Sequence, residues 1–235
     1  MNVQTKPAED IAALVAEIGR RAKAAAAALR TASTEAKNKA LSEAARLIRD
    51  SKATILAANA RDIEAAKAAG MSSALQDRLL LNDARIEAMA RGLDDIVALP
   101  DPVGVTIEEW QRPNGLSISR VRVPIGIIGV IYEARPNVTA DAGALCIKSG
   151  NVVVLRGGSD SFHSSRAIVE LLRRALKDAG LPEDCVALVP TTDRTAVGEM
   201  LKAMDWLDLV VPRGGRSLID RVTQESRVPV LRHYD

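Results

Sequence analysis

The sequence has few aromatic residues and no strong excess of either charge. Aromatic residues make up 2% of its 235 residues, and 32 Lys and Arg nearly balance 30 Asp and Glu. Surfaces that bind nucleic acids combine excess cations with aromatic rings on which bases stack, so this composition argues against a nucleic-acid partner. Apolar residues make up 47% of the chain, which suffices for one large core or for a core with a smaller attached unit.

Cysteine and histidine are equally scarce, at two residues each. Two cysteines cannot form a disulfide scaffold, and the spacing and number of these residues do not form a zinc site. We therefore expect no bound metal and a reducing, cytoplasmic environment. Acidic residues interrupt the N-terminal segment, which argues against a signal peptide or a membrane-spanning helix.

Neither cysteine is placed as a nucleophile. Cys146 falls at an apolar position of a predicted helix, and Cys185 begins a predicted strand. No histidine is spaced to activate either thiol, so we interpret both as small buried hydrophobes.

The first third of the chain predicts several amphipathic helices. From Pro7 to about Leu99 it is rich in alanine, with apolar residues at helical spacing. Ser33 or Thr34 is a candidate N-cap, Gly70 a C-terminal stop, and Asn82 the start of a helix through residue 97. The simplest interpretation is a helical layer that covers a sheet.

A β-hairpin is predicted next. Two strand-like runs, residues 105–112 and 116–123, are separated by Pro113-Asn114-Gly115. Two strands are marginally stable alone, so we expect this hairpin to pack on something else, such as another subunit.

The rest of the chain alternates short apolar runs with amphipathic segments. Continuous Val, Ile and Leu runs between helices are typical of a parallel sheet that is covered on both faces. The predicted fold class is therefore α/β, with a doubly wound parallel sheet. The predicted strands are residues 128–132, 152–155, 186–189, 207–211 and 228–231, and the predicted helices are residues 138–149, 161–179, 194–204 and 216–225.

Ligands of such sheets bind beyond the carboxyl ends of the strands. The run 152–155 is followed by Arg156, Gly157, Gly158 and Ser159, a cation and small residues at the start of a helix, where a phosphate or ribose would fit. The alternative is a tight turn with Ser159 or Ser161 as helix cap, and the local motif leaves both interpretations open. His163, in the first turn, is interpreted as solvated or capping.

A second loop of this kind follows the run 207–211. It contains Arg213, Gly214, Gly215 and Arg216 before another helix, which suggests a second anion site. Neither GxGxxG after a strand nor GxxxxGK[ST] is present, so neither the dinucleotide fingerprint nor a phosphate loop supports the argument.

The third loop, residues 132–137, places Asn137 after Pro136. Pro136 can start a helix, and the Asn137 amide can donate to a developing oxyanion. An Asn beside a Pro is also an ordinary cap or turn residue.

Longer segments carry a family resemblance. The stretches YEARPN (132–137), KSGNVVVLRGG (148–158) and DLVVPRGG (208–215) are similar to those of the gamma-glutamyl phosphate reductase family, within the aldehyde dehydrogenase superfamily. The resemblance runs the whole chain. It implies a Rossmann-like cofactor region at residues 124–235, an N-terminal helical part of that domain at 1–104, and a hairpin of the oligomerisation unit at 105–123.

The resemblance also implies residue roles. Asn137 takes the position of the superfamily's oxyanion-stabilising Asn, and Arg156 that of a cation that binds the cofactor ribose or phosphate. Ser159 replaces an acid of NAD-preferring relatives, which leaves room for a 2'-phosphate, although Asp160 is adjacent. The matching cofactor segments are Gly157, Gly158, Pro190 and Thr191, and Arg213, Gly214, Gly215 and Arg216.

The implied reaction is the NADPH-dependent reduction of L-glutamate 5-phosphate to L-glutamate 5-semialdehyde and phosphate, in proline biosynthesis. A cysteine thiolate displaces phosphate in this chemistry, and Asn137 would stabilise the oxyanion. Expected partners are the small-molecule substrate, further copies of the chain and glutamate 5-kinase.

In the family, the catalytic cysteine and catalytic domain follow a segment like VPVLRHYD (228–235), where this sequence ends. We therefore expect an inactive cofactor-domain fragment. The alternatives are a non-catalytic nucleotide-binding or assembly module, and a cofactor-free structural protein in which the glycine loops are only turns.

Overall fold

The computed structural model describes residues 8–232, and a parallel sheet of four strands lies at its centre. The strands are β3 (Ile127–Tyr132), β4 (Val152–Gly157), β5 (Val186–Leu188) and β6 (Leu209–Arg213), in the order β5-β4-β3-β6. Every residue of β3 is buried, which is why its sequence is a continuous apolar run. The expected parallel α/β sheet is confirmed.

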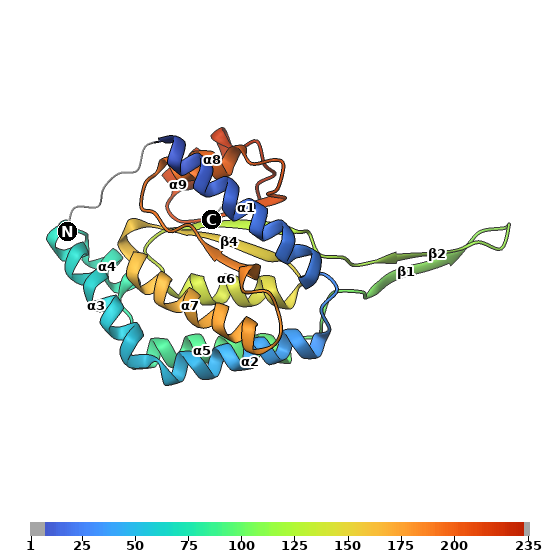
Figure 1. Cartoon of the computed structure of the whole chain (residues 1–235), viewed down its shortest axis with the longest axis horizontal. Helices are drawn as coiled ribbons and strands as arrows, with labels where there is room; N and C mark the ends of the chain where they lie inside the picture. Colours follow the sequence, from blue (N-terminus) through green and yellow to red (C-terminus); the bar gives the residue numbers. More distant parts are fainter. Residues whose placement is uncertain (1–7, 233–235) are drawn as a thin grey trace.

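Helices cover both faces of this sheet (Figure 1). On one face lie α6 (Asn137–Lys148) and α7 (Phe162–Asp178), with α2 (Thr34–Asp50), α3 (Lys52–Ala68) and α5 (Asp83–Ala98) packed outside them. On the other face lie α1 (Ala8–Leu29), α8 (Thr195–Lys202) and α9 (Arg216–Glu225). The sheet is therefore doubly wound.

The N-terminal helices do not form the single layer that the sequence suggested. The buried stripe of α1, which includes Ile11, Val15 and Leu29, packs on the face of the sheet opposite α2, α3 and α5. Helical periodicity identifies an apolar stripe but not the surface that covers it, so the sequence predicted these helices without their arrangement.

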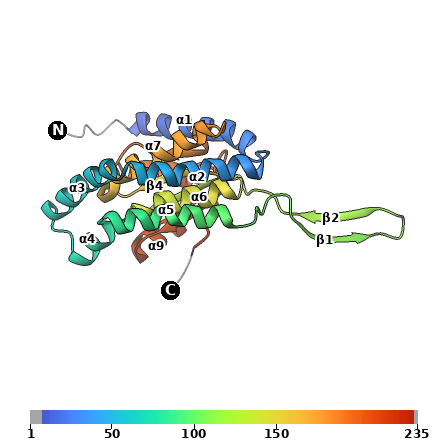
Figure 2. The same ribbon diagram turned by 90° about the horizontal axis from the view of Figure 1, so that it is seen from below.

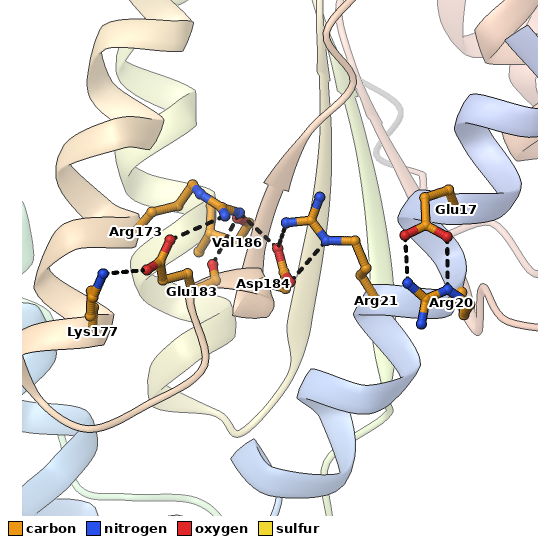
Figure 3. Close-up of polar contacts among 8 residues, drawn as sticks. All are labelled: Glu17, Arg20, Arg21, Arg173, Lys177, Glu183, Asp184 and Val186. Atoms are coloured by element: carbon orange, nitrogen blue, oxygen red, sulfur yellow. Dashed lines mark hydrogen bonds and ion pairs between the residues drawn. The ribbon is translucent and has the colours of Figure 1, made fainter.

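An ion-pair network holds α1 against the edge of the sheet next to β5 (Figure 3). Arg21 of α1 donates two hydrogen bonds to Asp184, in the 3-10 helix η2 (Glu183–Cys185), and Arg173 of α7 donates to the same carboxylate. Burial opposes ionisation of Asp184, but the bonds from Arg21 and Arg173 outweigh it and lower the pKa of its carboxyl. Three segments distant in sequence are thereby joined.

The predicted hairpin is present. Strands β1 (Thr106–Gln111) and β2 (Ser117–Val121) pair antiparallel and project from the body of the molecule (Figures 1 and 2). Several apolar residues of the hairpin are exposed, including Ile107 at 52% and Val123, just beyond β2, at 76%.

The last predicted strand, residues 228–231, is reduced to a single bridge between Val210 and Val230. Pro229 accepts a hydrogen bond from Val210 through its carbonyl but has no N–H to donate, so the ladder cannot extend. Strand β6 also begins later than predicted, because Asp208 uses its side chain to accept from the Ile127 N–H at 2.8 Å.

Predicted helix ends are largely confirmed. The side chain of Ser33 accepts from the Ala36 N–H at the start of α2, and that of Asn82 accepts from Arg85 at the start of α5. Gly70 has a φ of 69°, the left-handed conformation expected after a helix.

Candidate functional site

The main candidate site is a cavity of about 480 Å³ at the carboxyl ends of the strands. It lies where the strand order reverses, since β4 is on one side of β3 and β6 on the other, the position at which doubly wound sheets bind ligands. We call it the switch-point pocket. Its lining residues come from the ends of β3 and β4, the loop after β5, and helices α8 and α9, and include Tyr132, Glu133, Arg156, Gly158, Ser159, Asp160, Thr192, Arg194, Val197, Ser217, Leu218 and Arg221.

Arg156 is the most deeply buried cation of this pocket, with 5% of its surface exposed. Its guanidinium donates to the carbonyls of Gly157, Thr192 and Asp193, the last two at 3.0 and 3.1 Å. Its Nε has no hydrogen-bond partner within residues 8–232, and no carboxylate there pairs with it. A buried cation without an anionic partner is costly, and a bound anion would stabilise it.

A second cation faces the same pocket. Burial, and then the nearby charge of Arg194, lower the pKa of Arg156. The Arg194 side chain lines the pocket and makes no hydrogen bond or ion pair among the described residues. Arg221 differs, because Glu225 partly offsets its charge at 3.0 Å. Two cations that repel each other across one pocket favour a ligand with more than one negative charge.

Two carboxyl groups, those of Glu133 and Asp160, also line the pocket. Burial raises the pKa of Asp160, and its Oδ1 is buried without a partner among residues 8–232. This oxygen is available to accept from a hydroxyl group, such as that of a ribose.

The glycines after β4 allow a tight fit. A side chain at Gly158 would meet Asp160 Oδ1 at 2.4 Å, and one at Gly157 would meet the Tyr132 ring at 3.1 Å. Ser159, in contrast, is exposed at the pocket wall.

The cap at the start of α7 differs from the serine cap that the sequence suggested. It is Asp62 of α3, whose carboxylate accepts from the backbone N–H groups of His163 and Ser164, at 3.0 and 2.8 Å, and from the Ser164 hydroxyl at 2.6 Å. Capping by Ser159 or Ser161 is therefore wrong, because an internal carboxylate already holds these donors. A ligand in the pocket meets Arg156 rather than these two amides.

The loop after β6 lies at the rim. The pocket is lined by Ser217, Leu218 and Arg221 of α9 and not by Arg213, Gly214, Gly215 or Arg216, all four of which are exposed. The Gly215 N–H donates to Glu133 at 3.1 Å, and a side chain at Gly214 would meet the same carboxylate at 2.5 Å. These glycines thus bring the loop against the end of β3.

Pro190 and Thr191 do not line the switch-point pocket. Pro190 lines a separate cavity between α1 and α7, and the Thr191 hydroxyl accepts from the Asp193 N–H at 3.1 Å. Their neighbour Thr192 faces the pocket and supplies a carbonyl to Arg156.

Asn137 lies in a different cavity, of about 440 Å³, between α4 (Ser73–Leu79), α5 and α6. We call it the α5–α6 pocket. The Asn137 amide donates to Asp141 of the next helical turn at 3.0 Å, and burial raises the pKa of the Asp141 carboxyl. Arg135 lines the same cavity.

The loop from β3 to α6 separates the two pockets. Glu133 and Ala134 line the switch-point pocket, whereas Arg135 and Asn137 line the other. Ala134 has a φ of 46°, which L-residues other than Asn and Asp adopt at a cost of about 1–2 kcal/mol. Strain of this kind concentrates at functional sites.

We expect Ala134→Gly to stabilise the protein by on the order of 0.5 kcal/mol, because glycine adopts this φ freely but loses more chain entropy on folding. Urea unfolding followed by circular dichroism measures the change. Destabilisation by more than that amount would show that packing of the buried methyl group outweighs the strain.

The two cysteines are not nucleophiles. Both are buried, and burial raises the pKa of each thiol to about 12. Cys185 ends η2 rather than beginning a strand. His163 stacks edge-on against Phe162 and lines neither pocket.

Residues 8–232 contain neither a metal-binding cluster nor a helix that could span a membrane. No group of three or more His, Cys, Asp or Glu there is arranged to hold a metal ion. None of the helices in this range combines the length and the apolar content that a membrane span needs.

Comparisons with known proteins give one consistent family. The model of the aldehyde dehydrogenase family matches residues 2–232. Gamma-glutamyl phosphate reductases of Paramagnetospirillum magneticum and Brucella anthropi are 57% and 58% identical over 96% and 100% of this chain. The chain spans about half the length of these curated relatives, 53% and 55%.

Solved structures agree. Gamma-glutamyl phosphate reductase from Thermotoga maritima has a TM-score of 0.90 and 46% identity, with 92% of this chain and 52% of that chain covered. The enzyme of the same name from Saccharomyces cerevisiae has a TM-score of 0.86 and 31% identity, with 94% and 56% covered. A probable aldehyde dehydrogenase from Listeria monocytogenes, at 12% identity and a TM-score of 0.76 over 97% and 47% of the two chains, shares the fold.

Proposed function

Because this chain belongs to the aldehyde dehydrogenase family, we propose that it is the cofactor-binding part of an enzyme that reduces gamma-glutamyl phosphate with NADPH. The names of its relatives support the substrate. The observation that carries the cofactor assignment is the buried guanidinium of Arg156 in the switch-point pocket, whose Nε has no hydrogen-bond partner and which no carboxylate among residues 8–232 neutralises through an ion pair.

The pocket suits the adenosine end of NADPH. Its 2'-phosphate carries the excess negative charge that distinguishes NADPH from NADH, and Arg156 and Arg194 would bind it. Asp160 would accept from a remaining ribose hydroxyl. Val197 of α8 and Leu218 of α9 both line the pocket, and the adenine would lie between these apolar side chains.

The rim would hold the pyrophosphate. Helix α9 begins with no side-chain cap at Gly215, so its first amides can bind phosphate oxygens, with Arg213 and Arg216 beside them. Gly157, Gly158 and Ser159 would form the wall next to the ribose. Pro190 and Thr191 would act indirectly, by shaping the loop that presents Thr192.

The reacting carbonyl of the substrate would lie in the α5–α6 pocket, next to Asn137. A thiolate would first displace inorganic phosphate from the acyl phosphate, and NADPH, when bound, supplies the hydride that reduces the resulting acyl group to the aldehyde. Asn137 would donate to the oxygen that gains negative charge during this substitution. Asp141 holds the Asn137 amide from one side, which leaves its second N–H for the substrate.

The exposed hairpin suggests how subunits associate. Ile107, Val121 and Val123 are 52%, 41% and 76% exposed on a hairpin that projects from the body. We propose that a further copy of the chain covers this surface, because apolar area of this kind is normally buried.

The test is a calorimetric measurement of NADPH binding to this chain and to two variants of it. We expect Asn137→Ala to leave NADPH affinity nearly unchanged, because the proposed partner of its amide is the substrate oxygen and not the cofactor. Arg194→Gln is the matched variant in the switch-point pocket, and it should weaken NADPH by about tenfold. A large loss of NADPH binding in Asn137→Ala would contradict the oxyanion role.

A further inference from the structure

The α5–α6 pocket contains cations that the proposed roles do not use. We propose that Arg135 binds the phosphoryl group of the acyl phosphate, next to Asn137 at the carbonyl. The inference rests on the proposed function, because it assigns a part of that substrate to a residue.

Arg135 is free to bind a ligand. It is half-buried and lines the pocket, and its guanidinium makes no hydrogen bond or ion pair within residues 8–232. Arg85 of the same pocket is different, since it donates to the Asp77 carboxylate at 2.9 Å and to the Leu80 carbonyl at 2.8 Å. A planar guanidinium with all its donors available matches the oxygens of a phosphoryl group.

The charge of the pocket also favours a phosphoryl group. Three arginines (Arg78, Arg85 and Arg135) and two aspartates (Asp77 and Asp141) line it. Arg85 and Asp77 offset each other, and the pKa of Asp141 is raised by burial. With three arginines and two aspartates, the pocket carries one more positive than negative side chain, which favours an anion.

Arg135 and Asn137 are two residues apart in the chain and line the same pocket, and an acyl phosphate has two adjacent groups for them to bind. In this substrate the carbonyl carbon is joined to phosphorus through one bridging oxygen, so carbonyl and phosphoryl groups are neighbours. Arg135 and Asn137 flank Pro136, whose φ is −60° and whose side chain is buried. Pro136 thus restricts the backbone between two residues whose side chains line the same pocket.

This arrangement assigns the two groups different parts of the substitution. Arg135 would hold the phosphate that leaves with the electrons of its bond to the acyl carbon, and Asn137 would stay with the oxygen of that carbon. The competing assignment is that Arg135 binds the carboxylate of the amino-acid end of the substrate. The two assignments predict different ligands.

Inorganic phosphate and L-glutamate are the probes, each titrated calorimetrically into this chain saturated with NADPH at constant ionic strength. We expect phosphate to bind, and Arg135→Gln to weaken it by about tenfold or more, the effect of losing a charged hydrogen-bond pair. Arg166→Gln is the control, because Arg166 is an exposed arginine of α7 outside both pockets. It should leave phosphate binding unchanged.

Equal phosphate affinity in the unmodified chain and in Arg135→Gln would overturn the proposal, as would no phosphate binding at all. A loss of L-glutamate binding with phosphate binding retained would favour the carboxylate assignment instead. If the proposed function is wrong, NADPH does not bind to the chain. In that case the phosphate titration is repeated in the absence of NADPH, so that the two outcomes are distinguished. Phosphate held in the switch-point pocket would be lost in Arg194→Gln and kept in Arg135→Gln.

Discussion

NADPH is expected to bind the Arg156→Ala chain more weakly than the unmodified chain by about tenfold to a hundredfold, because a buried charged hydrogen-bond donor contributes about 1.5–3 kcal/mol. NADH, which has no 2'-phosphate, should lose much less. Calorimetric titration of both cofactors into both chains measures the difference. Equal weakening of NADPH and NADH would contradict contact between Arg156 and the 2'-phosphate.

The control separates charge from structure. Arg156 donates to the carbonyls of Thr192 and Asp193, so its removal also loosens the loop after β5. Arg156→Lys keeps the charge but loses the planar fork, and it should bind NADPH with intermediate affinity. If Arg156→Lys and Arg156→Ala weaken NADPH equally and both unfold at the temperature of the unmodified chain, charge alone is insufficient for binding.

Asp62→Ala is expected to lower the free energy of unfolding by about 3 kcal/mol. The substitution removes the cap of α7 and leaves two backbone N–H groups and the buried Ser164 hydroxyl without acceptors, and each such loss costs about 1–3 kcal/mol. The unfolding midpoint should fall by roughly 6–12 °C, measured by circular dichroism.

Two further variants define the origin of this loss. Asp62→Asn keeps one acceptor oxygen and places an NH₂ group where Asp62 accepts from its neighbours, so its loss should be intermediate. Asp95→Ala removes an exposed carboxyl from α5 and should change stability by no more than about 0.5 kcal/mol. An Asp62→Ala protein as stable as Asp95→Ala would show that water replaces the cap.

The central strands were predictable because burial on both faces of the sheet requires a continuous apolar sequence. The predicted strands at 128–132 and 152–155 therefore identified β3 and β4 directly. The strand predicted at 228–231 was wrong. Its composition matches a strand, but Pro229 prevents the ladder of hydrogen bonds from extending beyond one bridge. Ser33 and Asn82 were predictable caps because both act within three residues of themselves.

The cap of α7 was not predictable in this way. Asp62 is 101 and 102 residues away from the amides that it accepts from, so no local pattern connects them. The residues of the candidate site likewise include some that the local sequence identifies and others that it does not. Arg156 follows a recognisable strand, whereas Arg194 and Arg221 enter the pocket only because α8 and α9 meet above the sheet.

The most direct test of this account is a calorimetric titration of the unmodified chain with NADPH and, under the same conditions, with NADH. The account predicts that both bind in the switch-point pocket and that NADPH binds more tightly by on the order of tenfold, because only NADPH offers a 2'-phosphate to Arg156 and Arg194. NADH binding as tightly as NADPH, or binding of neither, would contradict it.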